Sequence, residues 1–431
     1  MVDMDTLTSL CKRRGIIFQS SEIYGGINGF WDFGPIGCEL KRRIKDSWWR
    51  FMVQARTDVV GIDTSIIAHP QTWISSGHVK SFADPMVDCK KCKRRFRADT
   101  DEVAGKTACP ECGGELTDPR QFNLMFQTNV GAAVDAASVA YLRPETCQSI
   151  FTQFRNVLQT SRGKLPLGIA QIGKAFRNEI TPRNFIFRSR EFEQMEMEFF
   201  CKPADSAQWY EYWVAQRFTW FAQLGIAPEL LRKRPHAKDE LAHYASGCTD
   251  IEFQMPFGWS EMEGIADRGT YDLTQHSVAA GTQLEYFDQV ANERFIPAVI
   301  ETSVGVDRTL LAVLVAAYRE ETVKDEPRVV LGFHPSIAPV QVAVLPLSNK
   351  LVEPAEKLAI DLRKRFAVEF DTAGSIGRRY RRQDEIGTPR CVTFDFQSLE
   401  DHAVTVRDRD TMTQERIGLS NLSAYLAEQL V

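Results

Sequence analysis

A pair of strands joined by a tight turn places the strongest constraint on the fold of this chain. The segment from Gly168 to Phe200 predicts two strands, and Thr181-Pro182-Arg183-Asn184 between them is typical of a hairpin turn. Because side chains alternate between the faces of a strand, the second strand has one apolar face, with Met195, Met197 and Phe199. Its other face suits a ligand and carries Phe192, Gln194 and Glu196. Strand patterns dominate the region that follows, which predicts a mostly antiparallel sheet with flanking helices, an α+β fold.

The residues before this pair supply further elements. Apolar residues at helical spacing predict a helix between Cys38 and Val53, namely Leu40, Ile44, Trp48 and Phe51. The apolar run from Val59 to Ala68 then predicts one strand that ends at His69-Pro70.

Two breaks in composition divide the chain. Residues 84–118 are dense in Lys, Arg, Gly and Cys and have poor apolar periodicity, so we expect an insertion within a first domain that spans 1–325. Residues 321–339 contain three prolines and a run of charges, which predicts an interdomain linker, placed at 326–338. Strand and helix patterns alternate beyond it, so 339–431 is expected to form a compact α/β domain.

The strongest metal signal lies in the predicted insertion. Two thiol pairs, each with two residues between the cysteines, are separated by sixteen residues, and the four are Cys89, Cys92, Cys109 and Cys112. This spacing is typical of a zinc-ribbon-like site in which four thiolates surround a structural Zn²⁺ ion. The alternative is four reduced cysteines in a loop without metal. The basic residues around the first pair either contact RNA or form a solvated charge run.

Charge and hydropathy exclude other classes of protein. The net charge of −5 argues against a chain coated with nucleic acid but leaves room for a local basic patch. The longest apolar run, Thr309 to Tyr318, is too short to span a bilayer, so no membrane association is expected. The acidic N-terminus lacks the apolar core of a signal peptide, which predicts a cytoplasmic protein with reduced thiols.

Three short patterns then occur in a fixed order. Pro70 follows a predicted helix and strand, and Arg177-x-Glu179 precedes an arginine-rich hairpin and Arg188-x-x-x-Phe192. Gly305-Val306-Asp307-Arg308 leads into the apolar helix 309–317. Each pattern is weak alone, but together they resemble motifs 1, 2 and 3 of the class II aminoacyl-tRNA synthetases.

Longer stretches resemble one branch of that class, the homodimeric glycyl-tRNA synthetases. They cover residues 14–26, 141–146, 190–196 and 258–266, and residues 374–380 resemble the anticodon-binding domain of that branch. The chain departs from the expected pattern at Cys147, Ser149 and Thr302. The resemblance implies a catalytic domain over 1–325, an anticodon-binding domain over 339–431 and a homodimer. It also implies ATP-dependent activation of glycine and its transfer to the 3′ end of tRNA(Gly).

The resemblance implies roles for individual residues. Arg177 and Arg308 are expected to be catalytic, with Arg177 at the α-phosphate, Phe192 stacked on adenine and Mg²⁺ bridging the phosphates of ATP. The expected ATP-binding set is Arg177, Glu179, Arg188, Phe192, Glu301 and Arg308, with Glu301 as the candidate magnesium ligand. A glycine ammonium attracts carboxylates, and the expected glycine-binding set is Arg143, Glu145, Glu196, Glu261 and Ser303. The expected tRNA-binding set is Arg378, Arg379, Arg381 and Arg382.

Alternatives remain at this stage. Asp384 and Glu385 follow the C-terminal arginines, so these arginines either bind RNA phosphate or form a salt-bridged helix face. The chain as a whole is a charging enzyme or a synthetase-like RNA-binding or accessory protein that no longer charges tRNA. A synthetase for threonine, proline or histidine shares the fold, but the glutamate-rich pocket and residues 14–26 favour glycine.

Overall fold

One large sheet organises the N-terminal three quarters of the chain. The computed structural model describes residues 2–242 and 245–430. The sheet has seven strands in the order β12-β13-β14-β17-β11-β10-β3, and only the β10–β3 pair is parallel. The α+β prediction is therefore confirmed. Its strands are β3 (Val59–Gly61), β10 (Leu167–Phe176), β11 (Glu191–Cys201), β12 (Leu231–Pro235), β13 (Gly247–Met255), β14 (Gly258–Gly269) and β17 (Ala298–Gly305).

The apolar face of this sheet is the one that the alternation along β11 predicts. Met195, Met197 and Phe199 are fully buried in the main core. Helix α6 (Ser206–Gln223) packs here, with the Trp209 and Trp213 rings 4.7 and 5.3 Å from the Phe199 ring. Helices α2 (Pro35–Trp49) and α8 (Val306–Ala317) contribute to the same core.

The predicted strand from Val59 to Ala68 is divided in two. Strand β3 joins the large sheet, whereas β4 (Ile67–Ala68) pairs with β9 (Val139–Leu142) in a separate sheet with β8 (Phe126–Asn129). Between them the carbonyl of Thr64 accepts a hydrogen bond of 2.9 Å from Arg143 Nη1. This buried contact draws the chain out of the large sheet, so the single-strand prediction is wrong.

Shorter elements surround the two sheets. At the N-terminus are α1 (Met4–Arg13), β1 (Ile17–Gln19), β2 (Trp31–Phe33), and the π-helical turn Arg50–Gln54 that extends α2. Helices α3 (Pro70–Ser75), α4 (His78–Ser81), α5 (Cys147–Ser161) and α7 (Tyr271–Ala280) lie near β9, and β15 (Tyr286–Asp288) with β16 (Glu293–Phe295) forms a hairpin. In the described part of the chain no helix is long and apolar enough to cross a bilayer.

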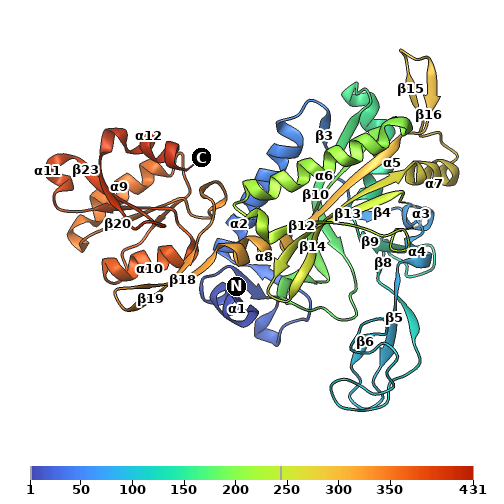
Figure 1. Ribbon diagram of the computed structural model, residues 1–431, viewed down its shortest axis with the longest axis horizontal. Coiled ribbons are helices and arrows are strands. Elements are labelled where there is room, and N and C mark those ends of the chain that lie inside the picture. Colours follow the sequence, from blue (N-terminus) through green and yellow to red (C-terminus); the bar gives the residue numbers. More distant parts are fainter. Residues whose placement is uncertain (1, 243–244, 431) are drawn as a thin grey trace.

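The cysteine-rich insertion projects away from the sheet (Figure 1). It is built on β5 (Ala83–Asp88), β6 (Arg95–Arg97) and β7 (Arg120–Asn123). Val87, Phe96, Val103 and Leu116 pack against the cysteines in a small core of their own. The poor periodicity of this segment therefore concealed a minor apolar cluster.

The segment predicted as an interdomain linker forms a β-hairpin of β18 (Tyr318–Val323) and β19 (Glu326–Leu331). It lies between the two halves of the molecule in Figure 1. Arg328 is fully buried, and its Nε donates a 2.8 Å hydrogen bond to Asp384 in helix α10 (Ile376–Ile386). Arg328 thus anchors the hairpin to the C-terminal domain, whereas the charge run Lys324-Asp325-Glu326 that suggested a linker lies at the turn of the hairpin.

The C-terminal domain has its own sheet and core. Strands in the order β21-β20-β22-β23-β24 form the sheet, which includes β20 (Val342–Pro346), β21 (Val368–Phe370), β22 (Arg390–Phe394), β23 (Ala403–Asp408) and β24 (Gln414–Gly418). Helices α9 (Val352–Leu362), α11 (Ser398–Asp401) and α12 (Leu419–Gln429) complete it with α10. The predicted alternation of strand and helix is present, and β24 is the strand that the sequence did not indicate.

Candidate active site

The polar face of the large sheet is ordered by strand register. Glu196 on β11 lies opposite Ser303 on β17, which lies opposite Gly264 on β14. Two residues further along, Glu198 lies opposite Glu301, and Glu301 lies opposite Ala266. Facing residues in an antiparallel sheet are neighbours on the same face. Four oxygen-bearing side chains from two strands are therefore held side by side, next to two small residues.

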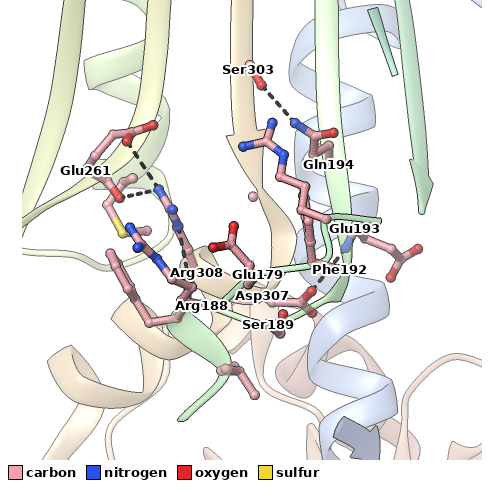
Figure 2. Close-up of a pocket in the computed structure, with 15 residues that line it drawn as sticks. Glu179, Arg188, Ser189, Phe192, Glu193, Gln194, Glu261, Ser303, Asp307 and Arg308 are labelled. Atoms are coloured by element: carbon pink, nitrogen blue, oxygen red, sulfur yellow. Dashed lines mark hydrogen bonds and ion pairs between the residues drawn. The ribbon is translucent and has the colours of Figure 1, made fainter. Parts of the chain in front are cut away.

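An open pocket of about 690 Å³ lies beyond one end of these rows. Three arginines line it, Arg177, Arg188 and Arg308, together with Glu179 and Phe192. In Figure 2, Arg188 and Arg308 lie together on the side of Glu261, and Phe192 lies across from them. The pocket therefore combines an aromatic ring with concentrated positive charge, a combination that suits a nucleotide with several phosphates.

Two backbone carbonyls orient the arginines of this pocket. Arg177 Nε donates to the Pro144 carbonyl at 3.0 Å, and its guanidinium lies 5.5 Å from the centre of the Phe192 ring. Arg308 Nε donates to the Phe187 carbonyl at 3.3 Å. Burial, together with nearby arginines, lowers the pKa of Arg188 in spite of the charge of Glu179. A bound polyanion would relieve this crowding of positive charge.

The sequence predicts that Arg177 and Glu179 lie on the first strand of the hairpin, and this prediction differs from the structure. Strand β10 ends at Phe176, and both residues lie in the loop that follows. In this loop the carbonyl of Glu179 accepts hydrogen bonds from Arg190 Nε at 3.1 Å and Nη2 at 2.9 Å. The side chain of Arg190 thus fixes the loop, and both Arg177 and Glu179 still line the pocket.

Glu196 is the centre of a buried polar cluster. One carboxylate oxygen accepts from the Thr146 N–H at 2.8 Å and from the hydroxyl of Thr146. The other accepts from Ser303 Oγ at 2.6 Å and from Gln194 Nε2 at 2.9 Å. Burial and the charge of Glu145 raise the pKa of Glu196 despite these donors. A cation in the cluster would favour its ionised form.

Glu145 stands beside this cluster. Its carboxylate pairs with His78 Nε2 at 3.2 Å and accepts from Cys147 Sγ at 3.0 Å and Gln148 Nε2 at 3.2 Å. Burial opposes ionisation here. However, the charges of His78 and Arg268 outweigh it and hold the pKa of Glu145 well below its usual range. Glu145 therefore supplies a lasting negative charge.

Glu301 lies in the carboxylate cluster rather than among the arginines of the open pocket. Its Oε2 pairs with Arg268 Nη1 at 2.9 Å, and Arg268 also binds Asp272. Ser303, two residues along the strand on the same face, lines the nucleotide pocket, whereas Glu301 itself does not. The role of Glu301 as a magnesium ligand stays a prediction, and its pairing with Arg268 favours a place in the carboxylate cluster. Burial raises the pKa of Glu301 to about 7, with contributions from Glu196 and Glu145 that Arg268 opposes.

Glu261 lies at the nucleotide pocket and not in the carboxylate cluster. Its carboxylate pairs with Arg308 Nη1 at 3.4 Å, and its side chain remains about half exposed at the nucleotide pocket. The charge of Arg308 is the main reason that the pKa of Glu261 is lowered. The expectation that Glu261 grips the glycine ammonium is therefore corrected, because this carboxylate is already paired at the other end of the site.

Arg143 lies beneath the same cluster and is almost completely buried. Its Nε donates to the Lys174 carbonyl at 2.7 Å. A Cβ atom at Gly173 would lie 2.1 Å from Arg143 Nη2, so glycine at this position makes room for the guanidinium. Arg143 thus joins three segments of the chain, and its positive charge favours ionisation of nearby Glu196.

The four cysteines of the insertion converge as their spacing predicts. All four sulfurs lie within 4.8 Å of one another, with Cys89 and Cys112 at 3.5 Å and Cys92 and Cys109 at 3.8 Å. Sulfurs placed 2.3 Å from a tetrahedral Zn²⁺ are separated by about 3.8 Å. A Cβ atom at Gly114 would lie 3.1 Å from Cys89 Sγ, so glycine keeps this cradle open. The donor set therefore fits zinc.

The four C-terminal arginines do not share one environment. Arg378 and Arg381 line a groove with Arg14 and Lys324. Arg382 lines the same groove and pairs with Asp371 at 2.5 Å. Arg379 is buried, and its Nη1 donates to the Pro346 carbonyl at 2.6 Å. The expectation that Arg379 contacts RNA is corrected, since its guanidinium faces the domain interior.

Sequence reasoning missed Arg268 and Glu198. Arg268 is buried between Asp272 and Glu301, and the available signal was an arginine near the end of a strand that also carries Glu261 and Glu263. Glu198 sits on β11 on the same face as Glu196. Its alternation with Met197 and Phe199 was visible in the sequence, but its partner Glu301 could not be known without the register.

Comparison with known proteins agrees with this geometry. Residues 134–317 match the tRNA synthetase class II core domain (G, H, P, S and T), and residues 341–429 match an anticodon binding domain. The chain is 53% identical over its full length to the glycine–tRNA ligase of Caldanaerobacter subterraneus subsp. tengcongensis, covering 99% of that protein. The chain belongs to the glycine–tRNA ligase family. The ligases of Treponema denticola (52% identical, 100% of this chain and 97% of that protein) and Thermobifida fusca (53%, 99% and 98%) are further members.

Binding of zinc by the four cysteines should be necessary for the ordered structure of the insertion. We expect Cys109→Ala to lower bound zinc by about one ion per chain, because three thiolates hold Zn²⁺ far more weakly than four. Elemental analysis of the purified protein measures the zinc, and limited proteolysis within 84–118 measures the order of the insertion. Cys391→Ala, a buried thiol of the C-terminal domain, is the control. Unchanged zinc in the Cys109 variant would contradict the assignment.

Proposed function

We propose that this protein activates glycine with ATP and transfers it to tRNA(Gly) in the cytoplasm. The observation that supports this most is that a pocket lined by Arg177, Arg188 and Arg308 lies next to a buried carboxylate cluster. The first suits a nucleotide, and the second suits an amino acid that offers nothing beyond its ammonium and carboxylate. Membership of the glycine–tRNA ligase family is independent support.

In the first step two anions meet. The glycine carboxylate attacks the α-phosphorus of ATP, a new O–P bond forms, and pyrophosphate leaves with the electron pair of the bond that breaks. Arg177 is our candidate for the α-phosphate, since a guanidinium offers two N–H groups to paired oxygens and stabilises the developing charge. Its Nε is held by the Pro144 carbonyl, so the group is orientated before the substrate arrives.

The remaining pocket residues position the nucleotide. Phe192 supplies a flat surface for adenine, while Arg188 and Arg308 offer positive charge to the outer phosphates. Of the four carboxylates around this pocket, Glu193 and Asp307 are both paired with Lys41. Glu261 pairs with Arg308 at 3.4 Å, but its side chain is about half exposed, so Glu179 and Glu261 are the residues that would hold Mg²⁺. When bound, the ion neutralises phosphate charge.

Glycine selection rests on the cluster beside this pocket. Glu145, Glu196 and Glu301 surround the proposed position of the ammonium, with Ser303 on the same face. Arg268 balances part of the negative charge and holds Glu301 in place. We include Glu301 here and leave Glu261 at the nucleotide. A larger amino acid would have to place its side chain among buried, hydrogen-bonded groups, which costs several kcal/mol.

In the second step the terminal ribose hydroxyl of tRNA attacks the glycyl adenylate and AMP leaves. The loop 181–187 follows Arg177 at the mouth of the nucleotide pocket, where the acceptor end must enter. Arg378, Arg381 and Arg382 are our candidates for contacts to tRNA phosphates at the other end of the molecule.

Exchange of labelled pyrophosphate into ATP, run with each of the twenty amino acids, tests this proposal. Exchange with glycine alone supports it. Exchange with another amino acid would keep the fold but overturn the pocket assignment. Absence of exchange from folded, zinc-loaded protein would favour the non-charging alternative, which the preserved arginines and carboxylates make the weaker reading.

Removing the guanidinium at the α-phosphate should abolish activation without unfolding the protein. We expect Arg177→Ala to lower pyrophosphate exchange by about 100- to 1000-fold, as for loss of one donor to a transition-state oxyanion. Thermal unfolding should change little. Arg155→Ala, on the exposed surface of α5, is the control. Normal exchange by the Arg177 variant would refute the assigned role.

Glycine affinity should depend on pH through Glu301. Its pKa is raised to about 7, and only the ionised form attracts an ammonium, so affinity is lost as pH falls below 7. We expect KM for glycine to rise about ten-fold between pH 8 and pH 6. Glu301→Gln should bind glycine weakly and lose this dependence, whereas Glu353→Gln in the exposed part of α9 should keep it. A pH-independent KM in the unmodified protein would contradict this role.

Contacts to tRNA should be confined to the arginines that line the C-terminal groove. We expect Arg378→Ala and Arg381→Ala each to weaken tRNA binding about five-fold and to reduce the salt slope of log K by roughly one. Lys357→Ala and Lys364→Ala on α9 are matched controls, since both lysines are exposed. Filter binding at several salt concentrations measures both quantities. An equal effect of the lysine variants would show that only total charge matters.

The homodimer implied by family resemblance is also part of this proposal. Size-exclusion chromatography with light scattering should give twice the chain mass of 48.9 kDa at micromolar concentration. A single species of one chain mass would remove the dimer from the proposal.

A further inference from the structure

A second group of possible metal ligands lies far from the insertion, at the floor of the glycine-binding cluster. Its members are Cys147 at the start of α5, Glu198 on β11 and Glu301 on β17. One sulfur and two carboxylate oxygens, one from each residue, all lie within 4.8 Å of one another. Three different elements therefore bring one thiol and two carboxylates to a single point inside the protein.

Glu198 gives independent evidence that this point is built for a ligand. Its side chain is fully buried, and within residues 2–242 and 245–430 neither of its carboxylate oxygens has a hydrogen-bond partner. An unsatisfied buried carboxylate costs several kcal/mol, and proteins rarely retain one without a partner. Glu301 Oε2 already pairs with Arg268, and Glu196 is satisfied by Thr146, Ser303 and Gln194. Of these three glutamates, Glu198 is thus the one whose carboxylate has no hydrogen-bond partner among the described residues.

The chemistry of the three donors identifies the class of cation. Carboxylates alone would suit Mg²⁺ or Ca²⁺, but a thiolate selects borderline or soft metals, of which zinc is the commonest in proteins. In a tetrahedral zinc site, ligand atoms are about 3.3–3.8 Å apart, so small side-chain rotations bring these three into range. Three protein ligands leave the fourth position open.

We propose that Cys147, Glu198 and Glu301 form a binding site for Zn²⁺, and that the ion occupies the site in place of the glycine ammonium. Binding replaces the thiol proton of Cys147 with a sulfur–zinc bond. Burial raises the pKa of Glu198, so zinc also displaces the proton of this carboxyl group, and both protons are released to solvent. The carboxylate of Glu198 gains the partner that it lacks. Because Glu301 is common to both sites, Zn²⁺ and glycine exclude one another. The site of the metal stands on the geometry alone, whereas this competition rests on the proposed function.

Cobalt is a suitable probe, because a thiolate bound to Co²⁺ gives a charge-transfer band in the near ultraviolet that carboxylates do not give. The full-length protein, with Zn²⁺ retained on its four insertion cysteines, is titrated with Co²⁺. We expect one further equivalent per chain. Cys147→Ala should remove the band, and Glu198→Gln should keep the band but weaken Co²⁺ binding at least ten-fold.

Cys248→Ala is the matched control, because Cys248 belongs to another group, with His236 and Asp250, and occupies the same row of the sheet. It should leave the titration unchanged. A band that persists in the Cys147 variant, or that disappears only in the Cys248 variant, would overturn the proposed site. Circular dichroism of each variant separates loss of the site from loss of the fold.

Competition is tested by repeating the titration with glycine and with L-alanine at equal concentration. Both amino acids chelate Co²⁺ in solution, but only glycine should also compete within the protein and so raise the half-saturation point further. Equal effects would overturn the shared position. Pyrophosphate exchange with glycine, measured on protein without added cobalt, reports on the proposed function separately. Failure there leaves the metal titration intact.

Discussion

Burial of several carboxylates on one face of a single sheet is the constraint on which the rest of the catalytic domain depends. Glu196, Glu198 and Glu301 are brought together by strand register and cannot all remain charged without cations. Arg268 supplies one such cation. In the function that we propose, the glycine ammonium supplies a second one, so the electrostatic need of the empty cluster favours a small ligand that carries an ammonium group.

The sheet also explains why the nucleotide pocket and the carboxylate cluster lie next to each other. One face carries Met195, Met197 and Phe199 into a core closed by α6, and that packing fixes the backbone of β11. The opposite face then presents Phe192 to the nucleotide pocket and Glu196, about 13 Å away along the strand, to the carboxylate cluster. A rigid core on one side of the strand therefore holds the nucleotide pocket and the carboxylate cluster at a constant separation.

Much of the fold followed from local patterns. The alternation along β11, the apolar helix α8 and the alternating elements after residue 339 all appear as predicted. The strand predicted from Val59 to Ala68 failed because the buried guanidinium of Arg143 draws Thr64 out of the sheet, a contact between residues distant in sequence. The prolines and the charge run within 321–339 predict a linker, but Arg328 is buried against Asp384 and holds this segment as the hairpin β18–β19.

The sequence by itself determined the spacing of the four cysteines and the two faces of β11, because each depends on short-range order along the chain. The pocket residues Arg177, Phe192 and Arg308 are predicted by family resemblance. Only the tertiary structure decided which glutamate lies at which end of the site. Glu261 faces Arg308, and Glu301 faces Arg268 and Glu198. Arg308 lies on helix α8, whereas Glu301, Arg268 and Glu198 lie on three strands that are far apart in sequence. A shift of one residue in the register of a strand would turn its side chains to the other face of the sheet.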